Sequence, residues 1–168
     1  MDIKELLDDE NPDPKKFFDE KEYNTLIVNR EGFSKKENDI ADLIETLTSK
    51  DVTRAETEEI FSKLKSLNAA KMLVDEIAKA KHGENKAKLC AACWESGLDF
   101  TEHFLFFTEL ACSNDFNIAM EALTVVENIE GTISEEILTK ALEIAQNTKS
   151  NNSTIIEDLI LNIRQRIS

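Results

Sequence analysis

The sequence predicts an all-α protein built from about four stacked helical hairpins. Its 168 residues include only four glycines and two prolines, and the prolines, Pro12 and Pro14, both lie near the start. Helix-breaking residues are therefore rare along the rest of the chain. Apolar residues recur at three- and four-residue spacing in one segment after another, which is typical of amphipathic helices. The linkers are short, which favours antiparallel packing of neighbouring helices.

Residues 1–33 are expected to form an N-terminal helical segment that packs on, or leads into, the main domain. Residues 3–9 have the composition of a short helix. A break follows at residues 10–14, because each proline disfavours helix in the residue before it. Asp13 can then cap a second helix that has Pro14 at its first position.

The main domain, a single unit of residues 34–168, is predicted to begin just after Gly32. Ser34 and Glu37 have the spacing of a capping box and precede a periodic apolar run. A second box is expected at Ser134, in the sequence Ser-Glu-Glu-Ile. The helices expected after the first one cover residues 53–67, 68–81, 85–96, 101–112, 115–130, 134–148 and 152–167.

Charge is distributed unevenly, and the acidic excess lies in the second half. The net charge is −14, and residues 89–139 contain ten Asp or Glu but no Lys or Arg. Such a surface repels phosphate groups, so neither nucleic acid nor an anionic membrane is expected as a partner. The sequence shows no apolar run of membrane-spanning length and no secretory signal, so a cytoplasmic protein with reduced thiols is expected.

One helix carries a family resemblance. The run from Asp115 to Val126 resembles the second helix of a HEAT repeat: Asp115, Ile118, Ala122 and Leu123 fit the pattern, while Ala119 stands where the family usually has Arg. The match is best over residues 85–168. It implies an irregular α-α superhelix, a HEAT- or armadillo-like solenoid, with the second helix of each hairpin lining a concave binding surface.

Two groups of residues suggest chemistry, and neither is expected to supply it. Cys90, Cys93 and Cys112 could be combined with His82 or His103 as zinc ligands, but two ligands three residues apart on one helix diverge by about 60°. Packing is the preferred reading of the thiols, and no metal or other cofactor is expected. His103 lies near Asp99 and Glu102, but no nucleophile accompanies it, so no catalytic residue is assigned.

The phenylalanines at positions 100, 104, 106, 107 and 116 are expected to be core residues.

The candidate partner-binding residues lie at matched sequence positions of three helices, and on each helix these positions form a stripe. The helix at 115–130 has a polar stripe, and the matched positions of the neighbouring hairpins add an aromatic, an acidic and an apolar residue. If these stripes line the concave surface, Trp94 lies beside Glu121 and Asp158. An aromatic anchor among carboxylates suits a basic, amphipathic peptide or helix. Alternatively, Trp94 packs under residues 1–33. The candidate binding residues are Trp94, Asn117, Glu121, Thr124, Asn128, Asp158 and Leu161.

The sequence thus favours a non-enzymatic module that binds a basic protein partner by shape and charge. One alternative is an inhibitor or immunity-type protein that masks a cationic enzyme. Another is an enzyme like the HEAT-like DNA glycosylases, which the lack of Lys and Arg on the stripes disfavours. The sequence indicates neither the oligomeric state nor the identity of the partner.

Overall fold

The computed structural model describes residues 20–49 and 51–168, and only the backbone for residues 20, 22–31 and 33. The expected helix at residues 3–9 and the expected cap at Asp13 lie outside the described residues. The chain divides into two units, Met1–Asp39 and Ile40–Ser168. The packing described below is that of the second unit.

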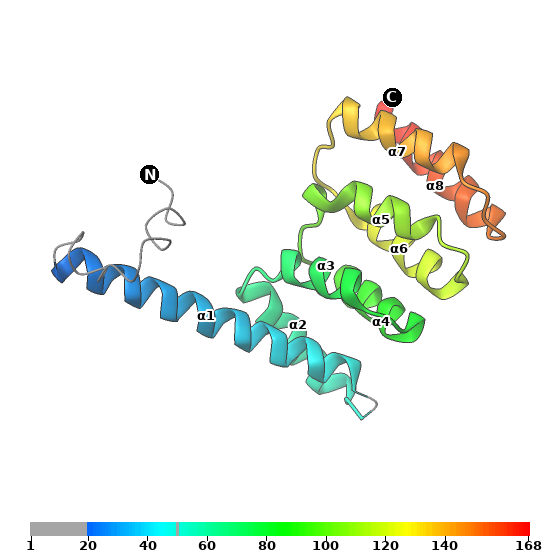
Figure 1. Cartoon of the computed structure of the whole chain (residues 1–168). Helices are drawn as coiled ribbons and strands as arrows, with labels where there is room; N and C mark the ends of the chain where they lie inside the picture. The colour runs from blue at the N-terminus through cyan, green and yellow to red at the C-terminus, as the bar shows by residue number, and fades with distance from the viewer. Residues whose placement is uncertain (1–19, 50) are drawn as a thin grey trace, which may run out of the picture. The chain divides into compact units, whose positions relative to one another are not determined.

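All regular structure in the described residues is helical, which confirms the all-α class (Figure 1). After α1 (Glu20–Thr48), the predicted helices appear with their ends shifted by a few residues at most. The predicted helix at 101–112 divides into a 3-10 turn and an α-helix. The elements are α2 (Arg54–Ser66), α3 (Ala70–Lys79), α4 (Gly83–Glu95), η2 (Thr101–His103), α5 (Phe104–Ala111), α6 (Phe116–Asn128), α7 (Glu135–Asn147) and α8 (Ser153–Ile167).

The predicted helix start at Ser34 is wrong. Helix α1 runs without interruption from Glu20 to Thr48, so Gly32 and Ser34 are interior residues and the predicted domain boundary falls inside a helix. Extending an existing helix adds a hydrogen bond per residue with no new nucleation, whereas one glycine costs only about 1 kcal/mol relative to alanine. Propagation therefore outweighs the local capping signal.

The complete capping box is at Thr53, where only a helix start was predicted. The Thr53 hydroxyl accepts a hydrogen bond from the Glu56 backbone N–H at 3.3 Å, and the Glu56 carboxylate accepts one from the Thr53 N–H at 2.8 Å. The second predicted box is only half formed. Ser134 accepts from the Ile137 N–H at 3.4 Å, but the side chain of Ile137 has no polar atom to return the bond.

Consecutive helices pair, and the pairs pack in sequence. Helix α3 packs on α4, α5 on α6, and α7 on α8. Across the pairs, α4 contacts α6 and α6 contacts α8, while α5 contacts α7. The second helices of the three pairs therefore form one layer (Figure 1).

The turns of the last two helix pairs are hydrogen-bonded to each other. Ser150 Oγ and Asn152 Nδ2 donate to the Ser113 carbonyl at 3.1 and 2.9 Å, and the Asn151 N–H donates to Asn114 Oδ1 at 3.3 Å. The α5–α6 turn thus contacts the α7–α8 turn. These bonds keep α6 and α8 in register.

Arg166 adds a further connection between α8 and the preceding pair. Its guanidinium donates to the Val126 carbonyl at 2.9 Å and lies 5.5 Å from the centre of the Phe104 ring.

Among the described helices, none combines the length and apolar character that crossing a bilayer requires.

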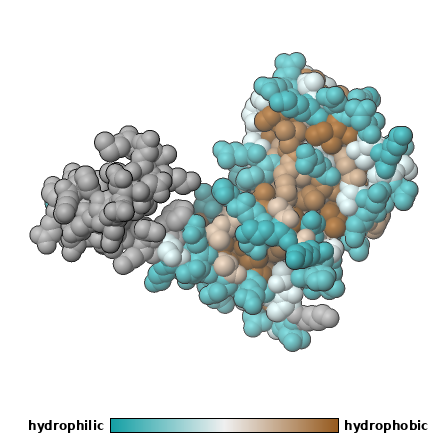
Figure 2. All heavy atoms as spheres, viewed as in Figure 1, coloured by the Kyte–Doolittle hydropathy of each residue, from teal (hydrophilic) through white to brown (hydrophobic). Residues whose placement is uncertain are grey.

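The buried face of α6 has the three- and four-residue spacing that predicts an amphipathic helix. On α6, Ala119, Ala122, Leu123 and Val126 are all buried. The phenylalanine cluster needs one correction, because Phe116 is 56% exposed and does not belong to the core. Phe100, Phe104 and Phe107 are buried and Phe106 is half-buried. On the face seen in Figure 2, hydrophobic residues form patches that hydrophilic residues surround.

Candidate functional site

Trp94 lies at the surface between two helices of the same layer. It belongs to the last turn of α4, and 36% of its surface is exposed. Its indole Nε1–H donates a 2.8 Å hydrogen bond to Glu121 Oε2 on α6. The bond fixes one edge of the ring and leaves an aromatic surface available to solvent.

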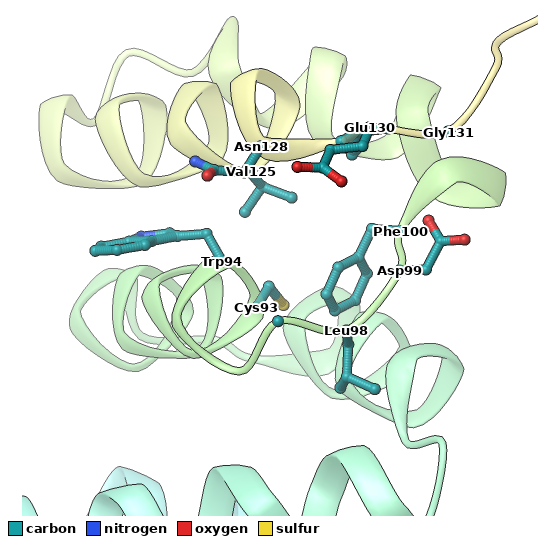
Figure 3. Close-up of a pocket in the computed structure, with 11 residues that line it drawn as sticks. Cys93, Trp94, Leu98, Asp99, Phe100, Val125, Asn128, Glu130 and Gly131 are labelled. Atoms are coloured by element: carbon teal, nitrogen blue, oxygen red, sulfur yellow. The ribbon is translucent and has the colours of Figure 1, made fainter.

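A hollow of about 410 Å³ adjoins Trp94 where α4 and α6 end; we call it the Trp94 hollow (Figure 3). Residues from the ends of both helices and from the two segments that follow them form its walls. The lining residues are Cys93, Trp94, Gly97, Leu98, Asp99, Phe100, Val125, Asn128, Ile129, Glu130 and Gly131. The hollow therefore combines an aromatic surface, an apolar wall and carboxylates.

Two glycines line this hollow at positions that disfavour a side chain. Gly97 follows α4 with φ +63°, a left-handed conformation that disfavours residues with a side chain. A Cβ atom on Gly131 would overlap the side chain of Thr101, so the backbones at these positions can approach only because residue 131 is glycine. No side chain at either position fills the space.

A second hollow, of about 480 Å³, lies at the opposite ends of the same two helices; we call it the Ala87 hollow. Small residues on α4 form part of its lining. Its only cation is Lys88, whose Nζ lies 3.3 Å from the Glu84 carboxylate. Glu121 lines this hollow and also accepts the bond from Trp94, so the Trp94–Glu121 pair lies between the two hollows. The lining residues are Gly83, Glu84, Ala87, Lys88, Ala91, Asp115, Asn117 and Glu121.

The Glu121 carboxylate acts on two ionisable groups of α4. Burial, and then the neighbouring Glu121 carboxylate, raise the pKa of Glu95 above its usual value. Burial, with a smaller contribution from Glu121, raises the pKa of Cys90 to about 12, although Lys86 acts in the opposite direction. The Glu121 charge thus affects ionisable groups on α4 as well as its hydrogen-bond partner.

The structure brings together some of the seven predicted binding residues. Trp94 and Asn128 line the Trp94 hollow, whereas Asn117 and Glu121 line the Ala87 hollow. Thr124 is half-buried, and its carbonyl accepts a bond from Asn128 Nδ2 at 2.7 Å.

The other two predicted residues lie elsewhere. Asp158 and Leu161 are exposed on α8 and line neither hollow. The alternative in which residues 1–33 cover Trp94 depends largely on residues outside the described part.

Sequence reasoning missed the residues that follow each helix. Asp99 and Glu130 supply the carboxylates of the Trp94 hollow, and Gly97 and Gly131 also line it. Two of the four glycines come shortly after predicted helices and lie 34 positions apart, close to the spacing of the hairpins. The recurrence of glycine after these two helices was the signal in the sequence that could have indicated the hollow.

The residues considered for metal binding and catalysis are dispersed. Cys90 and Cys93 are buried, Cys112 is half-buried, and all three thiols are free. No three metal-ligating side chains among the described residues are grouped closely enough to hold an ion. The Asp99 carboxylate accepts bonds from the N–H and hydroxyl of Thr101, and these bonds lower its pKa. That carboxylate therefore caps the turn before η2.

Comparisons of this chain with protein-family models, with curated proteins and with solved structures give no match. The chemistry of the Trp94 region therefore provides the basis for a functional proposal.

Proposed function

We propose that this protein is a non-enzymatic interaction module that binds a basic, amphipathic segment of a protein partner along the α4–α6 face. The observation that carries the proposal is the partly exposed Trp94, held by Glu121 between two hollows with carboxylate linings. A partly exposed tryptophan with a fixed orientation is a typical anchor of protein interfaces, because it buries a large area at little cost in conformational entropy.

The chemistry of the partner follows from the charge of the face. Glu84, Asp99, Asp115, Glu121 and Glu130 line the two hollows, against Lys88 alone, which already pairs with Glu84. Lys or Arg residues on one side of a partner helix would complement these carboxylates, while its apolar residues would contact Trp94.

The proposed architecture is an irregular α-solenoid of the HEAT or armadillo type, with about four hairpins. The layer formed by α4, α6 and α8 and the bonded turns support it. In such a solenoid the layer of second helices is the usual binding surface. We also propose a reducing compartment such as the cytoplasm, which the three free thiols support.

A pulldown with the full chain as bait, followed by a binding measurement with the recovered partner, tests this function. The Trp94→Ala variant should bind about 2 kcal/mol more weakly, as expected for a central aromatic anchor. Phe116→Ala is the matched control, because Phe116 is an exposed aromatic on α6 that lines neither hollow. Far-UV circular dichroism checks folding.

Equal binding by the wild type and Trp94→Ala would remove this face from consideration. A captured partner that is a cationic enzyme, and that loses activity in the complex, would identify the module as an inhibitor. Capture of nucleic acid through the same face would contradict the charge argument.

A further inference from the structure

We propose that the Trp94 hollow takes an arginine side chain of the partner, with the guanidinium group at Glu130 and the methylene stem along Trp94 and Val125. This inference rests on the proposed function and specifies the chemical group that the binding face recognises. It depends on three features of the hollow: its open space, its carboxylate and its apolar wall.

The carboxylate of Glu130 is available to a ligand. Glu130 is exposed, and within the described residues its side chain takes part in no hydrogen bond or ion pair. Figure 3 shows this carboxylate directed toward the space between α4 and α6, whereas that of Asp99 is directed away. Asp99 already accepts two bonds from Thr101. Of the two carboxylates, that of Glu130 is therefore the one that can accept a hydrogen bond from a ligand.

The helix ends add to the attraction for a cation. The carbonyl groups of the last turn leave the C-terminus of a helix with a partial negative charge, which a nearby Lys or Arg can offset. Helices α4 and α6 both end at the hollow, and neither has a basic residue in its last turn. Helices α5 and α7 also lack one, whereas α2, α3 and α8 carry Lys or Arg there. Each end already has a basic neighbour from another helix, because Arg166 donates to the Val126 carbonyl of α6 and Lys65 Nζ lies beside Gly97 after α4. The other carbonyls of the two last turns add a smaller attraction for a partner cation.

The apolar part of the wall distinguishes a long side chain from a small cation. Trp94, Val125 and Phe100 line the hollow, and Trp94 supplies most of the apolar surface because Val125 and Phe100 are almost fully buried. The methylene groups of arginine or lysine can lie on such a surface while the charged head reaches the carboxylate. A free metal ion or ammonium ion would gain nothing from this wall.

Arginine suits the site better than lysine. The planar guanidinium has five N–H donors and can donate to a carboxylate and to helix-end carbonyls at the same time. A lysine ammonium is more strongly hydrated and forms no bidentate bond. The hollow should therefore discriminate between peptides of equal charge.

The test uses acetylated, amidated hexa-arginine and hexa-lysine as probes of equal charge with the full-length protein. Trp94 is the only tryptophan in the chain, so its fluorescence reports binding at the hollow. Hexa-arginine should bind about tenfold more tightly than hexa-lysine. In a ¹H–¹⁵N spectrum, the amides of Gly97 and Gly131 should shift with the arginine peptide.

Glu130→Gln should abolish the preference for hexa-arginine, because it removes the charged acceptor and keeps the size of the side chain. Glu127→Gln is the matched control: it removes one negative charge from an exposed position on α6 outside the hollow, and the preference should persist. Circular dichroism and the Tm establish that both variants fold.

Equal affinity for the two peptides, or a preference that survives Glu130→Gln, would overturn the arginine site. If hexa-lysine binds as tightly as hexa-arginine, the proposed basic-partner function remains and only this inference fails. If neither peptide changes the fluorescence of Trp94 or the spectrum, both are overturned.

Discussion

The cysteines at positions 90 and 93 lie on the buried side of α4, where neither residue has exposed surface. Burial raises the pKa of both thiols, and that of Cys90 reaches about 12. A thiol with such a pKa is almost entirely protonated at neutral pH, so it is a poor nucleophile and a poor metal ligand. Small size and apolar character explain the use of cysteine in this contact between helices.

Cys93→Ser should lower the free energy of unfolding by about 1 to 3 kcal/mol, because it places a hydroxyl group where no solvent enters. Cys112→Ser is the control, since Cys112 is half-buried and a hydroxyl there can be hydrated. Urea unfolding under reducing conditions measures both changes. An equal loss at the two positions would contradict the packing role assigned to Cys93.

The raised pKa of Glu95 predicts that the stability of the protein depends on pH. Its pKa in the folded protein is raised by burial and by Glu121, so the folded state retains this proton to a higher pH than the unfolded chain. Stability therefore falls as the pH rises from about 4.3, the usual pKa of Glu, through the folded pKa, and the penalty persists above it.

Glu95→Gln should consequently stabilise the protein at pH 7 and have no effect near pH 3.5. The gain should be about 0.3 kcal/mol, because solvent screens this exposed position. Thermal unfolding at the two pH values measures it. A variant that is less stable at pH 7, or equally stabilised at both pH values, would contradict the assignment.

At the scale of the element, α6 shows how one helix serves both the core and the surface. Ala119, Ala122, Leu123 and Val126 form its buried side. Asn117 and Asn128 are exposed, and Glu121 is half-buried between them and the core. Asp115 caps the helix by accepting bonds from the backbone N–H groups of residues 117 and 118 at 3.0 and 3.2 Å. The cap fixes where the helix begins and therefore which residues face α4.

Leu123→Ala should destabilise the protein by about 2 to 5 kcal/mol, because it opens a cavity on the buried side of α6. Asn128→Ala on the exposed side should change stability by about 0.5 kcal/mol or less, since the lost bond to the Thr124 carbonyl is exposed to water. Denaturant unfolding compares them. Similar effects at the two positions would mean that the register of α6 differs from the structure.

For the whole molecule, the net charge of −14 should control how quickly a basic partner arrives. Charges on the surface of α6 and α8 act over about 10 Å at 0.1 M salt, so they steer encounter even when they touch nothing in the complex. Glu121 is unsuitable for testing this effect, because it also holds Trp94. Glu127 and Asp158 are exposed and outside both hollows.

Changing Glu127 and Asp158 together to Lys should slow association with the basic partner and flatten its salt dependence, with a much smaller effect on dissociation. Stopped-flow binding at two ionic strengths measures the rates, and a matched variant with both residues changed to Gln separates charge loss from charge reversal. Faster association of the Lys variant would show that the partner is not basic.

Most of the helical segmentation could be predicted from the sequence, because caps and apolar periodicity depend on residues within one or two turns of each other. Thr53, Asp115 and Ser134 each begin a helix through bonds to residues two or three positions away. The continuity of α1 through Gly32 was missed, since whether a helix continues depends on the total free energy of the segment and not on one capping signal.

The candidate site could be predicted only in part. The sequence by itself determined an acidic, all-α chain in which Trp94 is a surface candidate. The tertiary structure decided that Trp94 bonds to Glu121, 27 residues away, and that Gly131 lies against Thr101. It also placed Phe116 outside the core and Asp158 outside both hollows. Local sequence rules describe which side of a helix is apolar, but a hollow forms only where the packing of distant segments leaves space that no side chain fills.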